Sequence, residues 1–127
     1  MRAITYNLVI ERYATFSENI LVYTDEAGTL PFDFTGADAC MQIRPKIDGG
    51  GYGSVLLELN PTNERLILGG ALGYIELYIA DEDSDLSPNT YYYDIKIKNV
   101  DGTVDRILEG SVVVIEHNVS QPSVILV

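Results

Sequence analysis

The sequence contains little of the chemistry that enzymes and metal sites use. Its 127 residues include one cysteine, Cys40, one histidine, His117, and no tryptophan. A single cysteine excludes an intrachain disulfide and any zinc site that needs two thiolates, so we expect Cys40 to be an unreactive thiol. A catalytic triad or a multi-histidine metal site would have to be built around His117 alone. We interpret His117 as a solvated residue at the end of the last strand, and we expect a non-enzymatic protein without a cofactor.

Basic residues and long apolar runs are also scarce. The chain has 19 acidic and 8 basic residues and a net charge of -11. Because phosphate binding needs a clustered positive surface, this balance disfavours nucleic acid as a partner. The longest aliphatic runs, "VVVI" and "VILV", are far shorter than the ~20 residues of a membrane-spanning helix. The first residues, "MRAITYNLVIERY", alternate instead of forming a secretory signal. We therefore expect a chain assembled in a cytosol, with no membrane partner.

Three motifs imitate ligand sites without completing them. The acidic run at 81–85 resembles a calcium loop, but Leu86 and Tyr92 stand where that loop needs glycine and a bidentate acid. We expect a solvated turn there, with a single helical turn capped by Asp81 or Ser84. The glycine cluster at 49–53 lacks the Lys-Ser/Thr of a phosphate loop and predicts a mobile surface loop. "NVS" at 118–120 fits the glycosylation pattern by chance.

What the sequence does have is period-two alternation of polar and apolar residues, which is typical of β-strands. Ala39, Met41 and Ile43 should face the core from one strand, and residues 75, 77 and 79 share one face of another. In the first strand, residues 4, 6, 8 and 10 share a face. The segment "LPFDFTGA" is more typical of an irregular edge or corner. The expected strands cover residues 4–13, 19–24, 37–44, 54–59, 65–70, 73–80, 90–98 and 104–116.

The last two expected strands form a hairpin around Asp101-Gly102, a strong turn signal. The register stays open at this point. A two-residue loop sets Lys98 opposite Asp105, whereas a three-residue loop sets Asp105 opposite Ile97. The first register leaves Arg106 on the inward face of the hairpin, and the second leaves Asp105 there. We therefore expect a β-bulge near Arg106.

About seven or eight short antiparallel strands separated by regular turn signals predict an all-β fold. The favoured architecture is an immunoglobulin-like β-sandwich, with a small barrel as the alternative. We expect a single domain over residues 1–120, followed by a C-terminal tail over 121–127.

Tyrosines and the tail are the candidate contact residues. Tyr91 and Tyr93 fall on the inward face of their strand, where each hydroxyl needs a backbone partner, and Tyr92 falls on the outer face. Outward aromatic residues are enriched at protein interfaces. The tail either returns to its own sheet or adds a strand to a neighbour's sheet edge. The candidate interface residues are Tyr74, Tyr78, Tyr92, Val124, Ile125, Leu126 and Val127.

Five stretches together resemble a family of small structural proteins of tailed bacteriophages and prophages. They are the corner at 33–36, "MQIR" at 41–44, the turn and strand at 88–95, "RILEG" at 106–110 and the valine-rich run at 112–115. Phe34 stands where the family has leucine, and Asn89 where it has glycine; Asn tolerates a left-handed turn. The resemblance covers roughly residues 30–120 and does not include the tail.

The resemblance implies a non-enzymatic virion component, similar to the immunoglobulin-like adaptor domains of baseplates and capsids. Its expected partners are other virion proteins and copies of itself, and its expected location is the tail, the baseplate or the fibre attachment of the virion. A capsid decoration or cement protein is the alternative within this class. A carbohydrate-binding module that stacks sugars on Tyr74, Tyr78 and Tyr92 is the alternative from another class.

Overall fold

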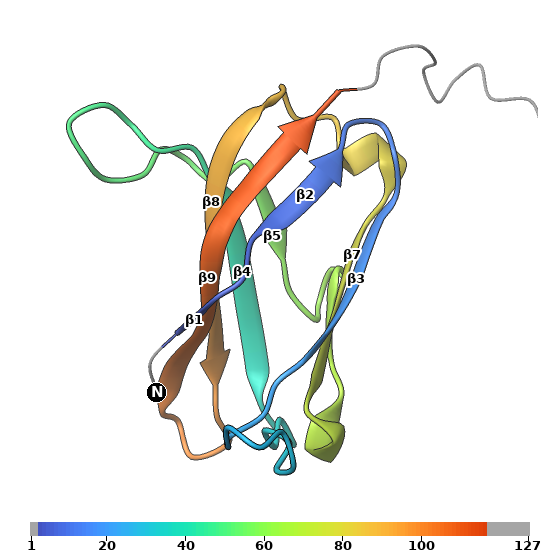
Figure 1. Cartoon of the computed structure of the whole chain (residues 1–127), viewed down its shortest axis with the longest axis vertical. Helices are drawn as coiled ribbons and strands as arrows, with labels where there is room; N and C mark the ends of the chain where they lie inside the picture. Colours follow the sequence, from blue (N-terminus) through green and yellow to red (C-terminus); the bar gives the residue numbers. More distant parts are fainter. Residues whose placement is uncertain (1–2, 117–127) are drawn as a thin grey trace, which may run out of the picture.

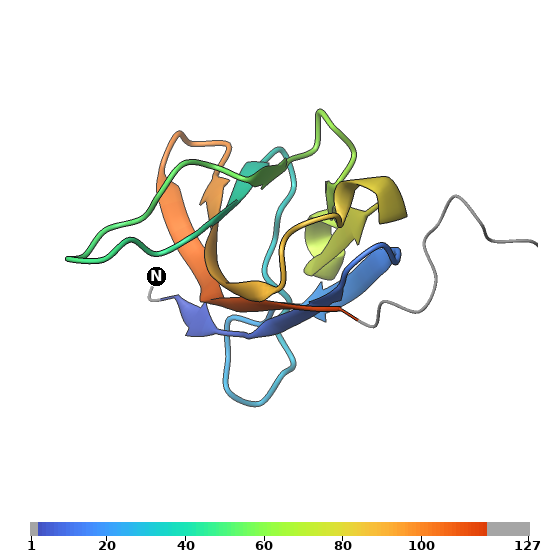
Figure 2. The same ribbon diagram turned by 90° about the horizontal axis from the view of Figure 1, so that it is seen from above.

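The computed structural model describes residues 3–116 and is built mainly of strands in two sheets, arranged like a sandwich (Figure 1, Figure 2). The large sheet has the order β1-β9-β8-β4-β5, with β2 also paired to β9, and the small sheet has the order β3-β7-β6. The strands are β1 (Ile4–Thr5), β2 (Leu8–Glu11), β3 (Phe16–Leu21), β4 (Asp38–Arg44), β5 (Leu57–Leu59), β6 (Leu66–Leu68), β7 (Tyr74–Ile79), β8 (Asn89–Lys98) and β9 (Val104–Ile115). Two short 3-10 turns, η1 (Gly70–Leu72) and η2 (Asp81–Asp83), flank β7. No helix among residues 3–116 has the length and apolar character needed to cross a membrane.

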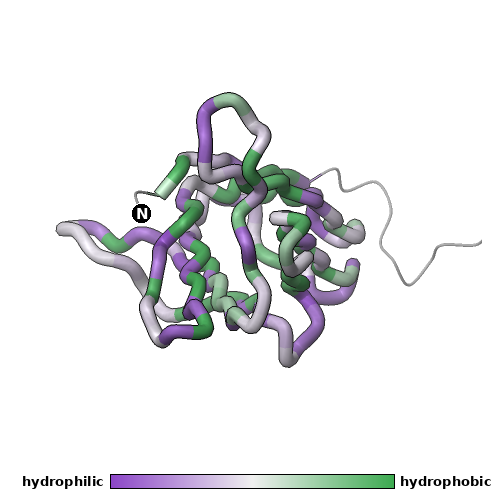
Figure 3. Tube along the Cα trace, turned by 90° about the horizontal axis from the view of Figure 1, so that it is seen from below, coloured by the Kyte–Doolittle hydropathy of each residue, from purple (hydrophilic) through white to green (hydrophobic). Residues whose placement is uncertain are grey.

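The core lies between the sheets and follows the predicted alternation. The side chains predicted to face inward from β4 and β7 are all buried, and their neighbours along the strands are not. The alternation is visible along the chain trace in Figure 3. Each of the larger side chains in this set contributes about 1.5–3 kcal/mol by leaving water, and Ala39 contributes less. The inward residues are Ala39, Met41, Ile43, Ile75, Leu77 and Ile79.

The N-terminal strand differs from the prediction in direction and in burial. β1 and β2 run parallel to β9, with Ile4 opposite Leu108 and Leu8 opposite Val112, so the prediction of purely antiparallel strands is wrong. Leu8 is buried, but Ile4 is 49% exposed. The strand is interrupted at residues 6 and 7, and only its second part, β2, covers the core. Parallel neighbours need no local turn. Their pairing therefore left no short-range signal in the sequence.

The β8–β9 hairpin contains the predicted bulge. Asp105 lies opposite Ile97, as the longer loop requires, and the register then shifts so that Leu108 lies opposite Ile95. The extra residue is Ile107, which is fully buried. A bulge adds one residue to one strand, and here it allows both Ile107 and Leu108 to enter the core.

Tyr91 and Tyr93 are packing residues, as predicted. Each side chain is 5% exposed. The Tyr91 hydroxyl donates to the carbonyl oxygen of Ser87 at 2.6 Å, and the Tyr93 hydroxyl donates to the carbonyl oxygen of Tyr6. Both buried hydroxyls thus have backbone acceptors.

Several boundaries and one cap also differ from the prediction. β3 begins at Phe16, three residues earlier than expected, and β5 is reduced to three residues. The corner at 30–37 is irregular, as predicted, and contributes the buried Phe34 to the core. The single helical turn at η2 is confirmed, but its N-cap residue is Ala80 and has no side-chain cap. The Ser84 hydroxyl instead donates to the carbonyl oxygen of Asp81 at the other end of that turn.

Candidate functional site

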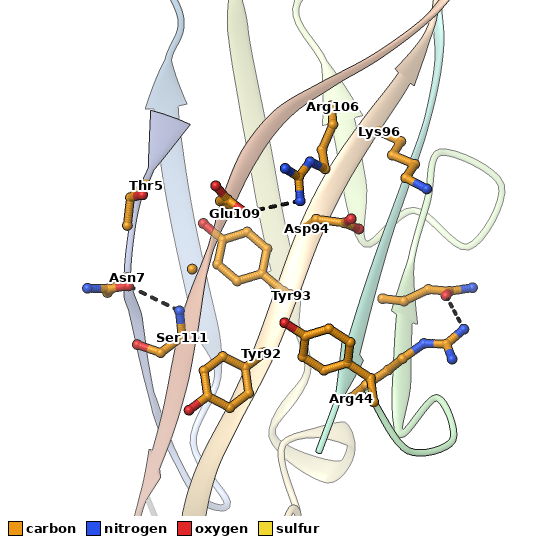
Figure 4. A pocket seen from close by; sticks show the side chains of 13 residues that line it. Thr5, Asn7, Arg44, Tyr92, Tyr93, Asp94, Lys96, Arg106, Glu109 and Ser111 are labelled. Atoms are coloured by element: carbon orange, nitrogen blue, oxygen red, sulfur yellow. Dashed lines mark hydrogen bonds and ion pairs between the residues drawn. The ribbon is translucent and has the colours of Figure 1, made fainter. Parts of the chain in front are cut away.

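A groove of 480 Å³ crosses the outer face of the large sheet (Figure 4). Its floor consists of outward side chains from β4, β8 and β9. One wall is the N-terminal segment, where the Asn7 side-chain oxygen accepts a hydrogen bond from the backbone N–H of Ser111 at 3.0 Å. At the other side stands the loop between β4 and β5, here called the arm (residues 45–56), which projects from the sandwich in Figure 1. The lining residues are Thr5, Asn7, Gln42, Arg44, Tyr52, Tyr92, Tyr93, Asp94, Lys96, Arg106, Glu109, Gly110 and Ser111.

Strand pairing arranges the outward side chains in three rows across the strands. The first row consists of Arg44, Tyr92 and Ser111. The second consists of Glu58, Gln42, Asp94 and Glu109, and the third of Cys40, Lys96 and Arg106. The rows therefore alternate in charge along the strands, from basic to acidic to basic. Figure 4 shows Tyr92 and Arg44 at one end of the groove, with Lys96 and Arg106 at the other.

The first row joins cations to aromatic rings. The Arg44 guanidinium donates to the side-chain oxygen of Gln42 at 2.7 Å and to the carbonyl oxygen of Gly53 at 3.3 Å. The Tyr52 ring from the arm lies 6.0 Å from the Tyr92 ring, centroid to centroid, and the Lys46 ammonium lies 5.8 Å from the Tyr92 centroid. An ammonium at this distance is attracted by the ring quadrupole. The arm thus completes this end of the groove.

The arm itself is a small hairpin-like loop. Lys46 and Tyr52 form a β-bridge, and three of its glycines have positive φ angles. Its Ile47 and Tyr52 side chains are 50% and 56% exposed. The surface position predicted for this glycine-rich segment is confirmed.

In the second row, one carboxylate already accepts three hydrogen bonds. Glu58 accepts hydrogen bonds from Gln42 at 2.9 Å, from Asn60 at 3.1 Å and from the Cys40 thiol at 3.5 Å. These bonds, chiefly the one from Gln42, lower the pKa of Glu58. Burial and Glu58 together raise the pKa of the Cys40 thiol, which keeps it protonated. An unreactive Cys40 is what the sequence predicted.

The third row ends in a solvent-exposed ion pair. Arg106 lies 3.0 Å from the Glu109 carboxylate of the second row, and both side chains are more than a third exposed. Such a pair contributes little to stability. Lys96, opposite Arg106 on β8, is exposed and forms no ion pair with any of residues 3–116.

The outer face of the large sheet concentrates the scarce positive charge. Five of the eight basic residues lie on it or over it, against five acidic ones on its strands, whereas the chain as a whole has 8 basic and 19 acidic residues. Arg12 and Arg65, which lie elsewhere, are ion-paired with Asp85 and Asp83. The basic residues of the face are Arg44, Lys46, Lys96, Lys98 and Arg106, and the acidic ones are Glu11, Asp38, Glu58, Asp94 and Glu109.

The structure separates the tyrosines that the sequence singled out. Tyr92 lies in the groove on the large sheet, whereas Tyr74 and Tyr78 lie on β7 of the small sheet. Tyr78 is 48% exposed, but the Tyr74 ring packs on the backbone of Gly69. A single stacking platform made of all three rings does not form. Val124, Ile125, Leu126, Val127 and His117 lie outside the described residues.

Sequence reasoning missed the basic residues of the groove. "MQIR" and "DIKIK" do carry Arg44 and Lys96 at outward positions of alternating strands, but alternation does not reveal which strands are neighbours. The acidic run at 81–85 is a surface turn in which Asp83 and Asp85 hold Arg65 and Arg12. Within residues 3–116 no group of three or more His, Cys, Asp or Glu side chains is placed to hold a metal ion.

No protein-family model matches the chain, and no curated protein matches it.

Proposed function

We propose that the chain is a non-enzymatic structural protein of a tailed-phage virion, which binds other virion proteins through the outer face of its large sheet. The observation that carries the binding role is the groove, where exposed cations and two tyrosine rings gather on a protein of net charge -11. Aromatic residues and arginine are enriched at the centres of protein interfaces. A hollow lined in this way is suited to docking a partner.

The finer fold proposed here is immunoglobulin-like. Taken in chain order, the small sheet contains the first, fourth and fifth of the seven strands from β3 to β9, and the large sheet contains the second, third, sixth and seventh. With β3 counted as strand B and β5 as strand C′, the small sheet contains B, D and E and the large sheet contains C, C′, F and G, which is similar to the two sheets of variable-type immunoglobulin domains. Tyr91, near the start of β8, adds support. Its hydroxyl donates to the backbone carbonyl oxygen of Ser87, four residues upstream, as in the tyrosine corner of immunoglobulin-like domains.

Four of the five stretches that resemble phage structural proteins lie together in space, and the fifth, at 33–36, forms the irregular corner before β4. Residues 41–44, 88–95, 106–110 and 112–115 fall on β4, on β8 with the turn before it, and on β9, three neighbouring strands of the large sheet. These strands form the floor of the groove. The resemblance therefore coincides with the surface proposed to bind, which favours a shared role in virion assembly.

The proposed location is the tail, the baseplate or the fibre attachment, and capsid decoration is the alternative. Mass spectrometry of purified particles that carry this gene should detect the chain, and fractions of tail-less heads should lack it. Detection in tail-less heads would favour capsid decoration instead. Absence from every particle fraction, with the chain still present in the infected cell, would contradict a virion role.

A carbohydrate-binding module is the second candidate, and the tilted Tyr52–Tyr92 pair favours it. Stacking on these rings predicts a glycan affinity that falls with Tyr92→Ala and stays unchanged with Tyr78→Ala on the opposite sheet. A glycan array without any bound sugar would remove this candidate.

A further inference from the structure

We propose that the groove binds an extended segment of a partner protein that presents two carboxylates on one side, four residues apart, with a basic or hydrogen-bond-donating residue midway between them. This inference rests on the proposed docking role of the outer face and specifies its ligand. Three features of the groove support it: cations without a carboxylate partner, their spacing, and the acidic row between them.

Arg44 is the first carboxylate-binding group. Its guanidinium donates to the Gln42 amide oxygen and to the Gly53 carbonyl oxygen, and both acceptors are neutral. They orient the guanidinium beside Tyr92 without neutralising its charge. A guanidinium held by neutral acceptors keeps donors for a bidentate contact with an incoming carboxylate. Lys46, above the Tyr92 ring, adds a second positive charge at this end.

Lys96 is the second carboxylate-binding group, and its distance from the first is set by the strand. Arg44 lies opposite Tyr92, and Lys96 lies four residues further along β8. Four residues of a β-strand span roughly 13 Å. An extended peptide that runs along β8 has the same rise, and its residues i, i+2 and i+4 point to the same side. Acidic residues at i and i+4 would therefore reach Arg44 and Lys96 together.

The acidic second row selects the residue between them. Asp94 lies midway between Tyr92 and Lys96 on β8, and its neighbour Glu109 is paired with Arg106. An acidic residue at i+2 would meet Asp94 and be repelled, whereas lysine, serine or asparagine at i+2 would be accepted. Glu58 takes no part, because its oxygens already accept three hydrogen bonds.

The charge and the shape of the groove argue against two other ligands. A nucleic-acid backbone is uniformly negative and would place phosphates on Asp94 and Glu109. A second copy of the large sheet would have to lie flat on this face, but the face is hollowed and the arm stands at its edge. A single extended segment that runs along β8 would instead lie between the arm and the N-terminal wall.

The test is a titration of the isotope-labelled full chain with capped peptides, followed by NMR. The matched peptide is Glu-Ser-Lys-Ser-Glu. One control has the same composition with adjacent acids, Glu-Glu-Ser-Lys-Ser, and the other has reversed signs, Lys-Ser-Glu-Ser-Lys. Saturable shifts confined to the outward residues of β4, β8 and β9 are expected with the matched peptide, with both controls binding several-fold more weakly.

Variants then assign the contact. Arg44→Gln keeps hydrogen-bonding capacity but removes the charge, so it should weaken the matched peptide by about fivefold, the scale of an exposed ion pair. Lys96→Gln should act similarly. Arg65→Gln, which removes an equal charge from the ion pair with Asp83, should leave the affinity unchanged. Thermal unfolding of each variant checks that it is folded.

The inference would be overturned by no binding of the matched peptide, by equal binding of the three peptides, or by Arg44→Gln binding as tightly as the parent. A dimer of the parent chain in sedimentation that Arg44→Gln dissociates would also overturn it, by assigning the face to a second copy. The proposed function has a separate readout. If the chain is found in particles but does not bind the peptides, the virion role stands and this ligand is wrong. If the chain binds the peptides but is absent from particles, the ligand stands and the virion role is wrong.

Discussion

The backbone of Tyr6 crosses directly over Gly110. A β-carbon on residue 110 would lie 2.4 Å from the Tyr6 carbonyl oxygen and 2.9 Å from the Asn7 side-chain oxygen. The same carbonyl oxygen accepts the hydrogen bond of the Tyr93 hydroxyl, and Tyr93 lies opposite Gly110 in the β8–β9 pair. The missing side chain thus allows the N-terminal segment to lie against β9 and form one wall of the groove.

Gly110→Ala should displace this wall. Overpacking of this kind costs about 1–3 kcal/mol of unfolding free energy, measured by chemical denaturation. Hydrogen exchange of the Tyr6 amide, which donates to the Glu109 carbonyl oxygen at 2.8 Å, should become faster. Ser111→Ala, at the next position of β9, is the control and should change stability by less than about 0.5 kcal/mol. An equal loss in the two variants would contradict a special role for Gly110.

Tyr93→Phe should destabilise the protein at neutral pH and make it less sensitive to alkali. Loss of the buried hydroxyl costs about 1 kcal/mol. Burial raises the pKa of Tyr93 in the folded state, so its unfolded form ionises first. Stability from this group is complete below the unfolded pKa of about 10 and decreases as pH rises above it. Unfolding free energies measured at neutral and alkaline pH should therefore decrease less steeply in Tyr93→Phe than in the parent. Parallel curves would contradict the linkage.

The contact between Gly69 and Tyr74 can be tested by a double-mutant cycle. A β-carbon on residue 69 would lie 2.3 Å from the Tyr74 ring, so Gly69→Ala must push the ring aside. We expect Gly69→Ala to cost about 1–3 kcal/mol in the parent and clearly less in a Tyr74→Ala background, measured by denaturant unfolding. Equal costs in the two backgrounds would show that the Tyr74 ring does not pack on residue 69. Tyr74 would then again be a candidate interface residue.

Asp25→Asn should remove part of the protein's sensitivity to acid. The Asp25 carboxylate accepts hydrogen bonds from the Thr29 hydroxyl and from the backbone N–H groups of Thr29 and Leu30, which lower its pKa. Because the folded pKa lies below the unfolded one of about 3.9, this stability is complete above that pH and is lost as pH falls through the folded value. Asp25→Asn should be less stable at neutral pH and should lose less on acidification. Glu26→Gln, in the same turn, should follow the parent, and thermal unfolding across this pH range would show the difference.

Local patterns in the sequence predicted what local geometry controls. Alternation alone located the inward residues of β4 and β7, because successive side chains of a strand point to opposite faces. The conflict between two hairpin registers predicted a bulge near Arg106, and the structure has it at the next residue, Ile107. The three tyrosines at 91–93 were correctly divided into two packing residues and one outward residue by the same alternation.

Tertiary structure alone decided the site. The parallel pairing of β1 and β2 with β9 joins the two ends of the described chain, and no turn signal records a contact between residues so far apart. Arg44, Tyr92 and Lys96 become one surface only when β4 lies beside β8, and the same assembly places Tyr74 and Tyr78 on the other sheet. The sequence by itself determined that the chain is mainly β and which residues point outward from most strands. Which outward residues meet depends on strand order, which long-range packing selects.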